Sequence, residues 1–355
     1  MINLNEIDKN DYKFISHIPE ELIDEKRLQN FFIAREEEKK KLTKLNSLPY
    51  HYVVEPTNSC NLRCPLCPTG LKIDSRKKGI LKIDSFKKIL EKISSSALAI
   101  YLQNWGEATL LKYLPEIIKL CSHNKIYTNL STNFSINYKN DFLLNLVKSG
   151  LTVLHIDLDG TTNETYSKYR RNGNLEIVLK NIKEVVRLKK ELGLKYPIIE
   201  TTMMAMRHNE HQIEDFKKLS KQLNVDQFNV GKIQVNPKSD TSKKWLPTNE
   251  EHVYSSYLNH EKTTPNPCHW PWSGMVINWD GNISACCIVD DVKADFGNIF
   301  NTDLKELWNN KKYISARSEF GDKKEITEKT ICNVCKNDTH NLKLNRKGES
   351  FSISF

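Results

Sequence analysis

Six apolar segments alternate with amphipathic helical segments between residues 50 and 233, and this alternation constrains the fold more than any other feature. The strand-like segments are 50–56, 97–103, 125–131, 151–158, 196–204 and 226–233. The helical segments are centred on 84–93, 115–122, 140–149, 174–192 and 210–223. Apolar strands joined by helical crossovers predict an α/β fold with a parallel sheet covered by helices. The pattern alone fits both an open doubly wound sheet and a partial barrel.

Cysteines and polar residues follow the first four predicted strands, at 60–67, 106–107, 131–133 and 157–160. In both architectures, ligands bind at the carboxyl ends of the strands. The sequence therefore predicts that these segments form one site.

The stretch CNLRCPLC places Cys60, Cys64 and Cys67 at the spacing C-x3-C-x2-C. Thiolates bind zinc and iron–sulfur clusters best. Structural zinc sites have four protein ligands, and plant-type ferredoxins use C-x4-C-x2-C, so neither pattern matches. Three thiolates on a four-iron cluster would leave one iron free to bind another ligand.

CNLRCPLC, after the first strand of an alternating β/α chain, resembles the motif of the radical S-adenosylmethionine (SAM) enzymes. The resemblance implies that the three cysteines hold a [4Fe–4S] cluster whose fourth iron binds the methionine part of SAM. It also implies a partial (β/α)6 TIM-like barrel. The implied reaction begins with an electron from a flavodoxin- or ferredoxin-type donor and cleaves SAM to a 5′-deoxyadenosyl radical.

Further segments resemble the family's SAM contacts. NWGEA (104–108) is similar to its Gly-Gly-Glu-Pro segment, and LSTNFS (130–135) is similar to its third-strand segment near the ribose. The cofactor contacts implied by these two segments are Gly106, Glu107, Ser131, Thr132 and Asn133.

IDLDG (156–160) resembles the family's fourth-strand Ser-x-Asp-Gly segment, with Asp157 in the Ser position. The following TYSKYRR offers Arg170 or Arg171 as a partner for the SAM carboxylate, because Arg binds carboxylates through two hydrogen bonds.

A second cysteine set, Cys268, Cys286, Cys332 and Cys335, resembles that of a SPASM domain in its shortened twitch form, made of a β-hairpin and a helix. The resemblance implies an auxiliary [4Fe–4S] cluster; the alternative is a four-Cys zinc site. Asp280-Gly281 predicts a two-residue hairpin turn. Neighbouring residues on a strand point to opposite faces, so Cys287 is expected not to be a ligand.

These observations predict five parts of the chain. They are a charged helical segment (1–48), the radical SAM barrel (49–240), a linker (241–264), the twitch/SPASM domain (265–340) and a basic tail (341–355).

A fully ligated auxiliary cluster would accept an electron from the substrate radical, which makes the net reaction a two-electron oxidation. Such an oxidation of an alcohol needs a base. His155 or Asp157 could serve if both face the barrel lumen. Alternatively, both only hydrogen-bond SAM or each other. Lys232 and Glu200 are weaker candidates.

The predicted function is a dehydrogenase-like radical SAM oxidoreductase acting on a sugar, an aminocyclitol or a similar small molecule. The alternative is a peptide maturase that oxidises or cross-links its substrate. Many such maturases carry a leader-binding winged-helix domain, for which the segment before Tyr50 is short. A two-cluster electron-transfer protein would explain the cysteines, but not Glu107, Asn133 or six β/α units.

Charge and hydropathy argue against two classes of binding partner, nucleic acid and membrane. The net charge is +9, but the basic residues are mostly Lys interleaved with Glu, which is typical of solvated helix faces and does not favour nucleic acid. No apolar run approaches the ~18 residues of a membrane span, and the N-terminus lacks the apolar core of a signal peptide. A cytoplasmic protein is expected.

Overall fold

The computed structural model describes residues 14–73, 75–139, 141–233, 243–254, 268–321, 328–335, 345–346 and 349–350. The main sheet contains β1 (His51–Val54), β2 (Ala99–Tyr101), β3 (Tyr127–Thr132), β4 (Val153–Asp157), β5 (Ile198–Ala205), β6 (Gln227–Lys232), β7 (Gly274–Ile277) and β8 (Ile283–Ser284). A separate pair is formed by β9 (Asn345–Arg346) and β10 (Glu349–Ser350).

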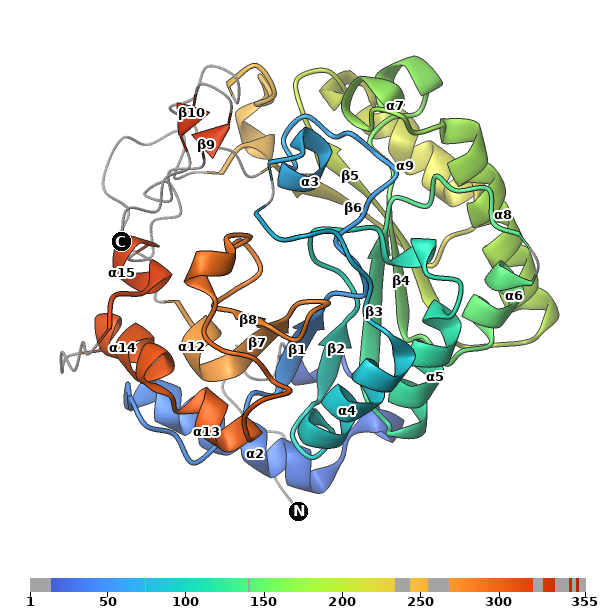
Figure 1. Cartoon of the computed structure of the whole chain (residues 1–355). Coiled ribbons are helices and arrows are strands. Elements are labelled where there is room, and N and C mark those ends of the chain that lie inside the picture. The colour runs from blue at the N-terminus through green and yellow to red at the C-terminus, as the bar shows by residue number, and fades with distance from the viewer. Residues whose placement is uncertain are drawn as a thin grey trace.

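Helices surround this sheet in Figure 1. The α-helices are α2 (Glu25–Lys39), α3 (Pro68–Leu71), α4 (Ile83–Ile93), α5 (Leu114–His123), α6 (Phe142–Val147), α7 (Asn163–Tyr169), α8 (Leu175–Glu191), α9 (Ile213–Gln222), α12 (Trp270–Ser273), α13 (Leu304–Trp308), α14 (Lys311–Glu319) and α15 (Ile331–Cys335). Short 3-10 helices are η2 (Glu20–Leu22), η3 (Ala108–Leu110), η4 (Glu210–Gln212), η5 (Glu250–His252) and η6 (Val292–Ala294). None of the helices in the described ranges is long and apolar enough to cross a membrane.

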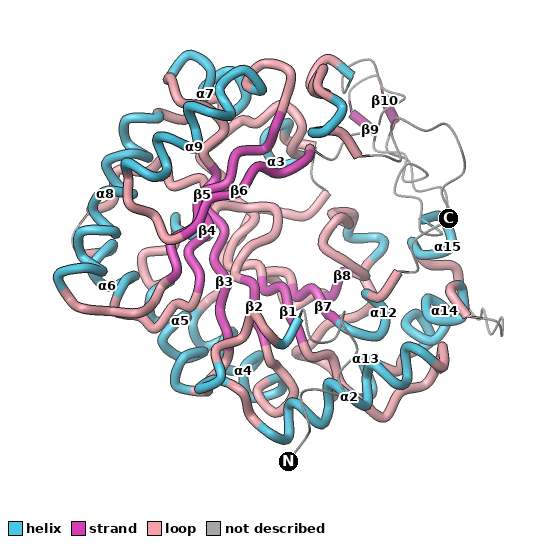
Figure 2. Tube along the Cα trace, turned by 180° about the vertical axis from the view of Figure 1, so that it is seen from behind, coloured by secondary structure: helices cyan, strands magenta, loops and turns pink. Residues whose placement is uncertain are grey.

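The sheet order is β6-β5-β4-β3-β2-β1-β7-β8, and β1 to β6 are all parallel. Each crossover therefore moves the chain by one strand in the same direction, and Figure 2 shows that the sheet is curved rather than flat. A doubly wound sheet would reverse its strand order at a switch point. The expected partial barrel is confirmed, and all six predicted strands are present within a few residues of their expected bounds.

The two faces of each strand have different surroundings. On β4, Leu154 and Ile156 are fully buried against the helix layer, whereas His155 and Asp157 are partly exposed on the other, lumen-facing side. β5 continues this pattern, with Ile199 buried and Glu200 partly exposed. This alternation places polar side chains inside the barrel while the helices cover its outer face.

The N-terminal segment packs against the barrel as well as carrying charge. Leu28, Phe31 and Ala34 of α2 are buried and belong to a cluster with Tyr50 and Tyr127. Tyr127 begins β3 and Tyr50 precedes β1, so α2 lies at the amino ends of the strands, opposite the end that carries the cysteine loop.

The C-terminal hairpin belongs to the same sheet as the barrel. β7 pairs in parallel with β1, and β8 returns antiparallel to β7. The Asn278 backbone N–H donates to the Asn282 carbonyl oxygen at 2.9 Å, and Gly281 between them has a φ of +80°. The loop therefore has three residues, 279–281, and the two-residue turn predicted at Asp280-Gly281 is wrong. A three-residue loop whose last residue has a positive φ, here Gly281, is another common type of hairpin connection.

The described part of the predicted linker, 243–254, is hydrogen-bonded to the segment that follows β5. The backbone N–H of Arg207 donates to the Trp245 carbonyl oxygen at 3.0 Å. The Glu210 carboxylate accepts the backbone N–H groups of Thr248 and Asn249, each at 3.0 Å. Of the predicted basic tail, only the short β9–β10 pair lies within the described residues.

Candidate active site

The three cysteines of the first motif lie in one loop between β1 and α3. Cys67 is the N-cap residue of α3, and its backbone N–H donates to the Cys64 carbonyl oxygen at 3.3 Å. Burial raises the pKa of Cys60 to about 11 and that of Cys64 to about 12, and the neighbouring Cys67 thiolate contributes to both increases. The three thiols are thus close enough to influence one another, as ligands of one cluster must be.

The loop fits an iron–sulfur cluster in its donor chemistry and in its packing. Thiolates are the usual ligands of such clusters. A Cβ atom at Gly70 would overlap the Cys64 carbonyl oxygen, so α3 packs directly against the loop backbone. The Arg63 guanidinium donates to the carbonyl oxygens of Cys60 and Leu62 at 3.0 and 2.7 Å. These contacts hold the cysteine backbone in place.

Gly106 brings the NWGEA loop into direct contact with the segment before the cysteines. A Cβ atom there would overlap the Thr57 carbonyl oxygen, so only glycine allows this approach. The next residue continues the contact, because the Glu107 N–H donates to the Ser59 carbonyl oxygen at 2.8 Å. The structure therefore joins the second-strand motif to the cysteine loop, as the sequence predicted.

The Glu107 carboxylate is buried and already has several partners. Its Oε1 accepts the Thr109 and Thr132 hydroxyls, both at 2.6 Å, and its Oε2 accepts the Asn133 backbone N–H at 2.8 Å. Burial raises the pKa of Glu107, while these hydrogen bonds act in the opposite direction. Glu107 thus fixes the end of β3 as well as being the expected SAM contact.

Asn133 connects β3 with the cysteine loop. Its Nδ2 donates to Asn61 Oδ1 at 3.0 Å and lies 3.8 Å from Cys60 Sγ. Its Oδ1 accepts the Ser135 N–H at 2.9 Å. The asparagine expected near the SAM ribose therefore lies beside the first cysteine.

Ser131 and Thr132 point to opposite faces of β3. Thr132 is buried and bonded to Glu107, whereas Ser131 is partly exposed on the lumen side, opposite His155 of β4. Of these two predicted cofactor contacts, Ser131 faces the lumen, whereas Thr132 faces the other side of β3 and donates to the Glu107 carboxylate.

The lumen face carries a charged group on β4 and β5. His155 Nε2 lies 3.7 Å from Asp157 Oδ1, and His155 Nδ1 lies 3.4 Å from Glu200 Oε2. Burial lowers the pKa of His155, but Asp157 and Glu200 outweigh that effect and raise it to about 10. His155 is therefore a cation near neutral pH, a state that does not favour its predicted role as a base.

Arg170 and Arg171 have different surroundings. Arg170 donates from Nε to Asp159 Oδ2 at 2.6 Å, and its Nη2 lies 3.2 Å from Asp157 Oδ2. Arg171 is exposed. Of the two arginines proposed as partners of the SAM carboxylate, only Arg170 is joined to the charged group on β4.

The second cysteine set is brought together from three separate segments. Cys286 and Cys287 lie just after β8, so the strand argument used to choose between them does not apply. Burial raises the pKa of Cys286, and the thiolates of Cys287, Cys332 and Cys268 add to the increase. Burial also raises the pKa of Cys332, with Cys268 and Cys335 contributing next.

Cys287 lies next to Cys286 and its charge adds to the increase at Cys286, while burial raises the pKa of Cys287 itself. In the described ranges, no three Cys, His, Asp or Glu side chains converge on the position of a single metal ion. A [4Fe–4S] cluster binds each thiolate through a different iron and does not require such convergence.

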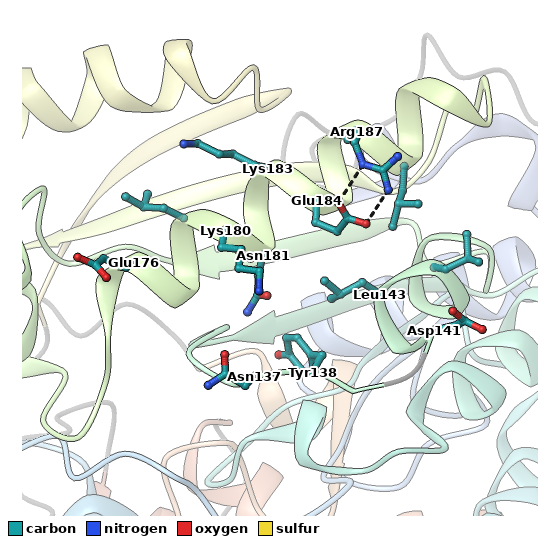
Figure 3. Close-up of a pocket in the computed structure, with 13 residues that line it drawn as sticks. Asn137, Tyr138, Asp141, Leu143, Glu176, Lys180, Asn181, Lys183, Glu184 and Arg187 are labelled. Atoms are coloured by element: carbon teal, nitrogen blue, oxygen red, sulfur yellow. Dashed lines mark hydrogen bonds and ion pairs between the residues drawn. The ribbon is translucent and has the colours of Figure 1, made fainter.

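A groove of about 940 Å³ lies on the outer helix layer, and the hydroxyl of Tyr138, one of its lining residues, donates to Thr109 Oγ1 at 2.8 Å. Figure 3 shows it between α6, α8 and the loop before α6, with Tyr138 and Asn181 at its base. It contains no cysteine and none of the expected SAM contacts. Its Arg187 is paired with Glu184 and Glu191.

Two buried acids near the site received no role from the sequence: Asp159, which lies in the predicted site segment 157–160, and Glu55, which sequence reasoning missed. Asp159 accepts the Met204 backbone N–H at 2.8 Å as well as Arg170. Glu55, fully buried directly after β1, accepts N–H groups from Trp105 and Trp279. The only feature of the sequence that could have pointed to Glu55 is that it is a single acidic residue at the end of an apolar strand. Its hydrogen-bond partners are distant in sequence.

Comparison with known proteins gives two family matches. Residues 54–220 match the model of the radical SAM superfamily, and residues 268–336 match SPASM, an iron–sulfur cluster-binding domain. The first match spans the cysteine loop and most of the barrel, and the second spans the second cysteine set.

Two curated relatives are similar in sequence. The PqqA peptide cyclase of Bradyrhizobium diazoefficiens is 28% identical over 190 residues, which cover 53% of this chain and 47% of that protein. The subtilosin biosynthesis protein AlbA of Bacillus subtilis is 23% identical over 280 residues, covering 74% of this chain and 60% of that protein. This chain thus spans about half of the length of these relatives.

Among solved structures, SuiB of Streptococcus suis shares the fold, with a TM-score of 0.60 and 19% identity over 82% of this chain and 72% of SuiB. SuiB has also been solved with bound SAM. The two cysteine sets, the barrel and both family matches lead to the same assignment. The chain carries a radical SAM domain at residues 54–220 and, C-terminal to it, a SPASM iron–sulfur cluster-binding domain at residues 268–336.

Proposed function

We propose that this chain is a radical SAM enzyme that modifies a peptide, by oxidation or by forming a cross-link. The similarity to AlbA, a bacteriocin biosynthesis protein, carries the proposal, because it extends over 280 residues and thus well beyond the radical SAM match. The relative named as a peptide cyclase supports it. These relatives favour peptide modification over the sugar or aminocyclitol dehydrogenase predicted from the sequence.

The two family matches indicate SAM and [4Fe–4S] clusters as cofactors. We assign the first cluster to Cys60, Cys64 and Cys67, and the auxiliary cluster to Cys268, Cys286, Cys332 and Cys335. Together with SAM, the first cluster supplies the radical chemistry that removes a hydrogen atom from an unactivated carbon, while the protein orients the substrate and excludes water.

The lumen residues on β4 and β5 are the proposed substrate contacts. The two ring nitrogens of His155 face Asp157 and Glu200, so His155 stays a cation and holds these two carboxylates in place in the lumen. Glu200 accepts peptide N–H groups. Asp157 is the other base candidate of the predicted pair. Burial raises the pKa of its carboxyl group, but Arg170 and His155 outweigh that effect and lower it, so this role is not favoured either. A flavodoxin- or ferredoxin-type protein is the expected electron donor.

The test uses the anaerobically reconstituted protein with SAM and dithionite. One set of reactions contains synthetic peptides encoded by short reading frames next to its gene, and a matched set contains sugars and aminocyclitols. We expect one peptide to accelerate 5′-deoxyadenosine release and to lose two hydrogen atoms in mass. The proposal fails if every peptide is unchanged while a sugar or aminocyclitol is oxidised.

A further inference from the structure

The NWGEA loop and the auxiliary hairpin meet at one buried carboxylate. Glu55 follows β1 and is fully buried. Its Oε1 accepts the Trp105 backbone N–H at 3.2 Å, and its Oε2 accepts the Trp279 backbone N–H at 3.5 Å. Trp105 belongs to the predicted SAM loop and Trp279 to the loop of the β7–β8 hairpin, so one side chain connects two motifs far apart in sequence.

Other contacts join the same two loops. Asn104 Nδ2 lies 3.4 Å from Asn278 Oδ1, and the Trp105 indole N–H donates to the Val289 carbonyl oxygen at 3.4 Å. Val289 lies shortly after Cys286 and is buried. Trp105, which replaces the first glycine of the family's segment, therefore reaches the cysteine-bearing part of the auxiliary domain.

A second connection starts after α3, on the other side of the cysteine loop from Glu55. Arg76 is buried and donates to Asp280 at 2.7 Å and to Asp295 at 2.7 and 2.8 Å. The backbone beside Arg76 is held by Asn58, whose Nδ2 donates to the Lys77 carbonyl oxygen at 2.9 Å. Asn58 is two residues before Cys60, so the hairpin is attached on both sides of the first cluster motif.

We propose that Glu55 is a positioning residue that couples the SAM loop to the auxiliary hairpin, so that SAM binding and an ordered hairpin stabilise each other. The proposal rests on the assignment of 104–108 to SAM. Such coupling is reciprocal by thermodynamic necessity: if the hairpin strengthens SAM binding, SAM must stabilise the hairpin to the same extent.

The coupling is tested first in the reconstituted wild-type protein by hydrogen–deuterium exchange with and without SAM. SAM should slow exchange in peptides covering 104–108 and also in those covering 278–282. Slower exchange in neither segment would refute the SAM assignment itself. Slower exchange only at 104–108 would refute the coupling and leave the assignment intact.

Glu55→Gln tests the residue directly. A glutamine has one acceptor oxygen, and its NH2 group would face the second N–H donor, so one of the two connections must break. The SAM dissociation constant should rise about tenfold, as expected for one lost hydrogen bond to a charged group, and SAM should no longer protect 278–282. An unchanged dissociation constant with SAM-dependent protection retained would refute the role of Glu55.

Glu37→Gln is the matched control. Glu37 is also a buried carboxylate that accepts backbone N–H groups, from Asn46 at 2.7 Å and Ser47 at 3.1 Å, but it lies on α2 at the opposite end of the barrel. It should leave SAM affinity and the protection of 278–282 unchanged. If Glu37→Gln has the same effects as Glu55→Gln, both substitutions act by lowering the stability of the whole fold, and the proposal is wrong. If Glu55→Gln does not fold, the wild-type exchange experiment decides.

Discussion

Arg170 is held by Asp159 through a 2.6 Å hydrogen bond from Nε, and Asp159 is completely buried. Asp157 adds a second carboxylate, 3.2 Å from Nη2. The arginine thus neutralises two acids at the end of β4, and its charge also acts on Cys64. This arrangement fixes the position of the predicted SAM contact Asp157.

Arg170→Met should destabilise the protein by about 3–5 kcal/mol, because it leaves the fully buried Asp159 carboxylate without its cation. The free energy of unfolding in urea, measured anaerobically, checks this value. Arg187→Met is the control: Arg187 is paired with Glu184 and Glu191 at the surface, where solvent screens the charges, and should change stability little. Equal effects of the two substitutions would contradict the buried ion-pair network.

The stabilising effect of His155 should depend on pH. Its pKa in the folded protein is raised to about 10 by Asp157 and Glu200, against 6.5 as its ordinary value. A raised pKa stabilises the folded state fully below pH 6.5, and the stabilisation is lost as the pH rises through about 10. The difference in unfolding free energy between wild type and His155→Gln should therefore shrink over that interval. A difference that stays constant with pH would show that His155 is not held as a cation.

Glu107→Ala should weaken SAM binding severely and lower stability. The substitution removes the expected charge-assisted hydrogen bond to the SAM ammonium group. It also leaves the Asn133 N–H and the Thr109 and Thr132 hydroxyls without their acceptor. Equilibrium dialysis of SAM with the reconstituted protein measures the first effect, and thermal unfolding measures the second. Normal SAM affinity combined with lowered stability would show that Glu107 only supports β3.

Cys286→Ala and Cys287→Ala should differ in iron content. Two [4Fe–4S] clusters give about eight irons per reconstituted chain. Cys286→Ala should lose or destabilise the second cluster, because the Cys286 thiol is coupled to Cys268 and Cys332. The first cluster and uncoupled 5′-deoxyadenosine release should survive.

Cys287→Ala should keep both clusters, because Cys268, Cys286, Cys332 and Cys335 already supply the four thiolates that we assign to the auxiliary cluster. Cys64→Ala is the opposite control and should abolish SAM cleavage. If iron counts instead show that Cys287→Ala loses the second cluster while Cys286→Ala keeps it, the ligand assignment is reversed.

The sequence alone determined the six β/α units, the cysteine loop after the first strand and the second cysteine set. These features are local: strand and helix periodicity depends on neighbouring residues, and three thiols within eight residues share one loop. The contact between Gly106 and the segment before the cysteines was also predictable, because consecutive parallel strands end at the same edge of a sheet.

Only the tertiary structure decided which charged side chains act together. Arg170 and Arg171 are adjacent in sequence, yet Arg170 is partly buried between two aspartates and Arg171 is exposed. The proposed role of Glu55 depends on hydrogen bonds from Trp105 and Trp279, which are 50 and 224 residues away in sequence. The pairing of β7 with β1 places the hairpin beside the predicted SAM loop. Burial without water makes an unpaired charge costly, so the folded chain fixes these partners, but no local pattern of residues encodes which distant segments will supply them.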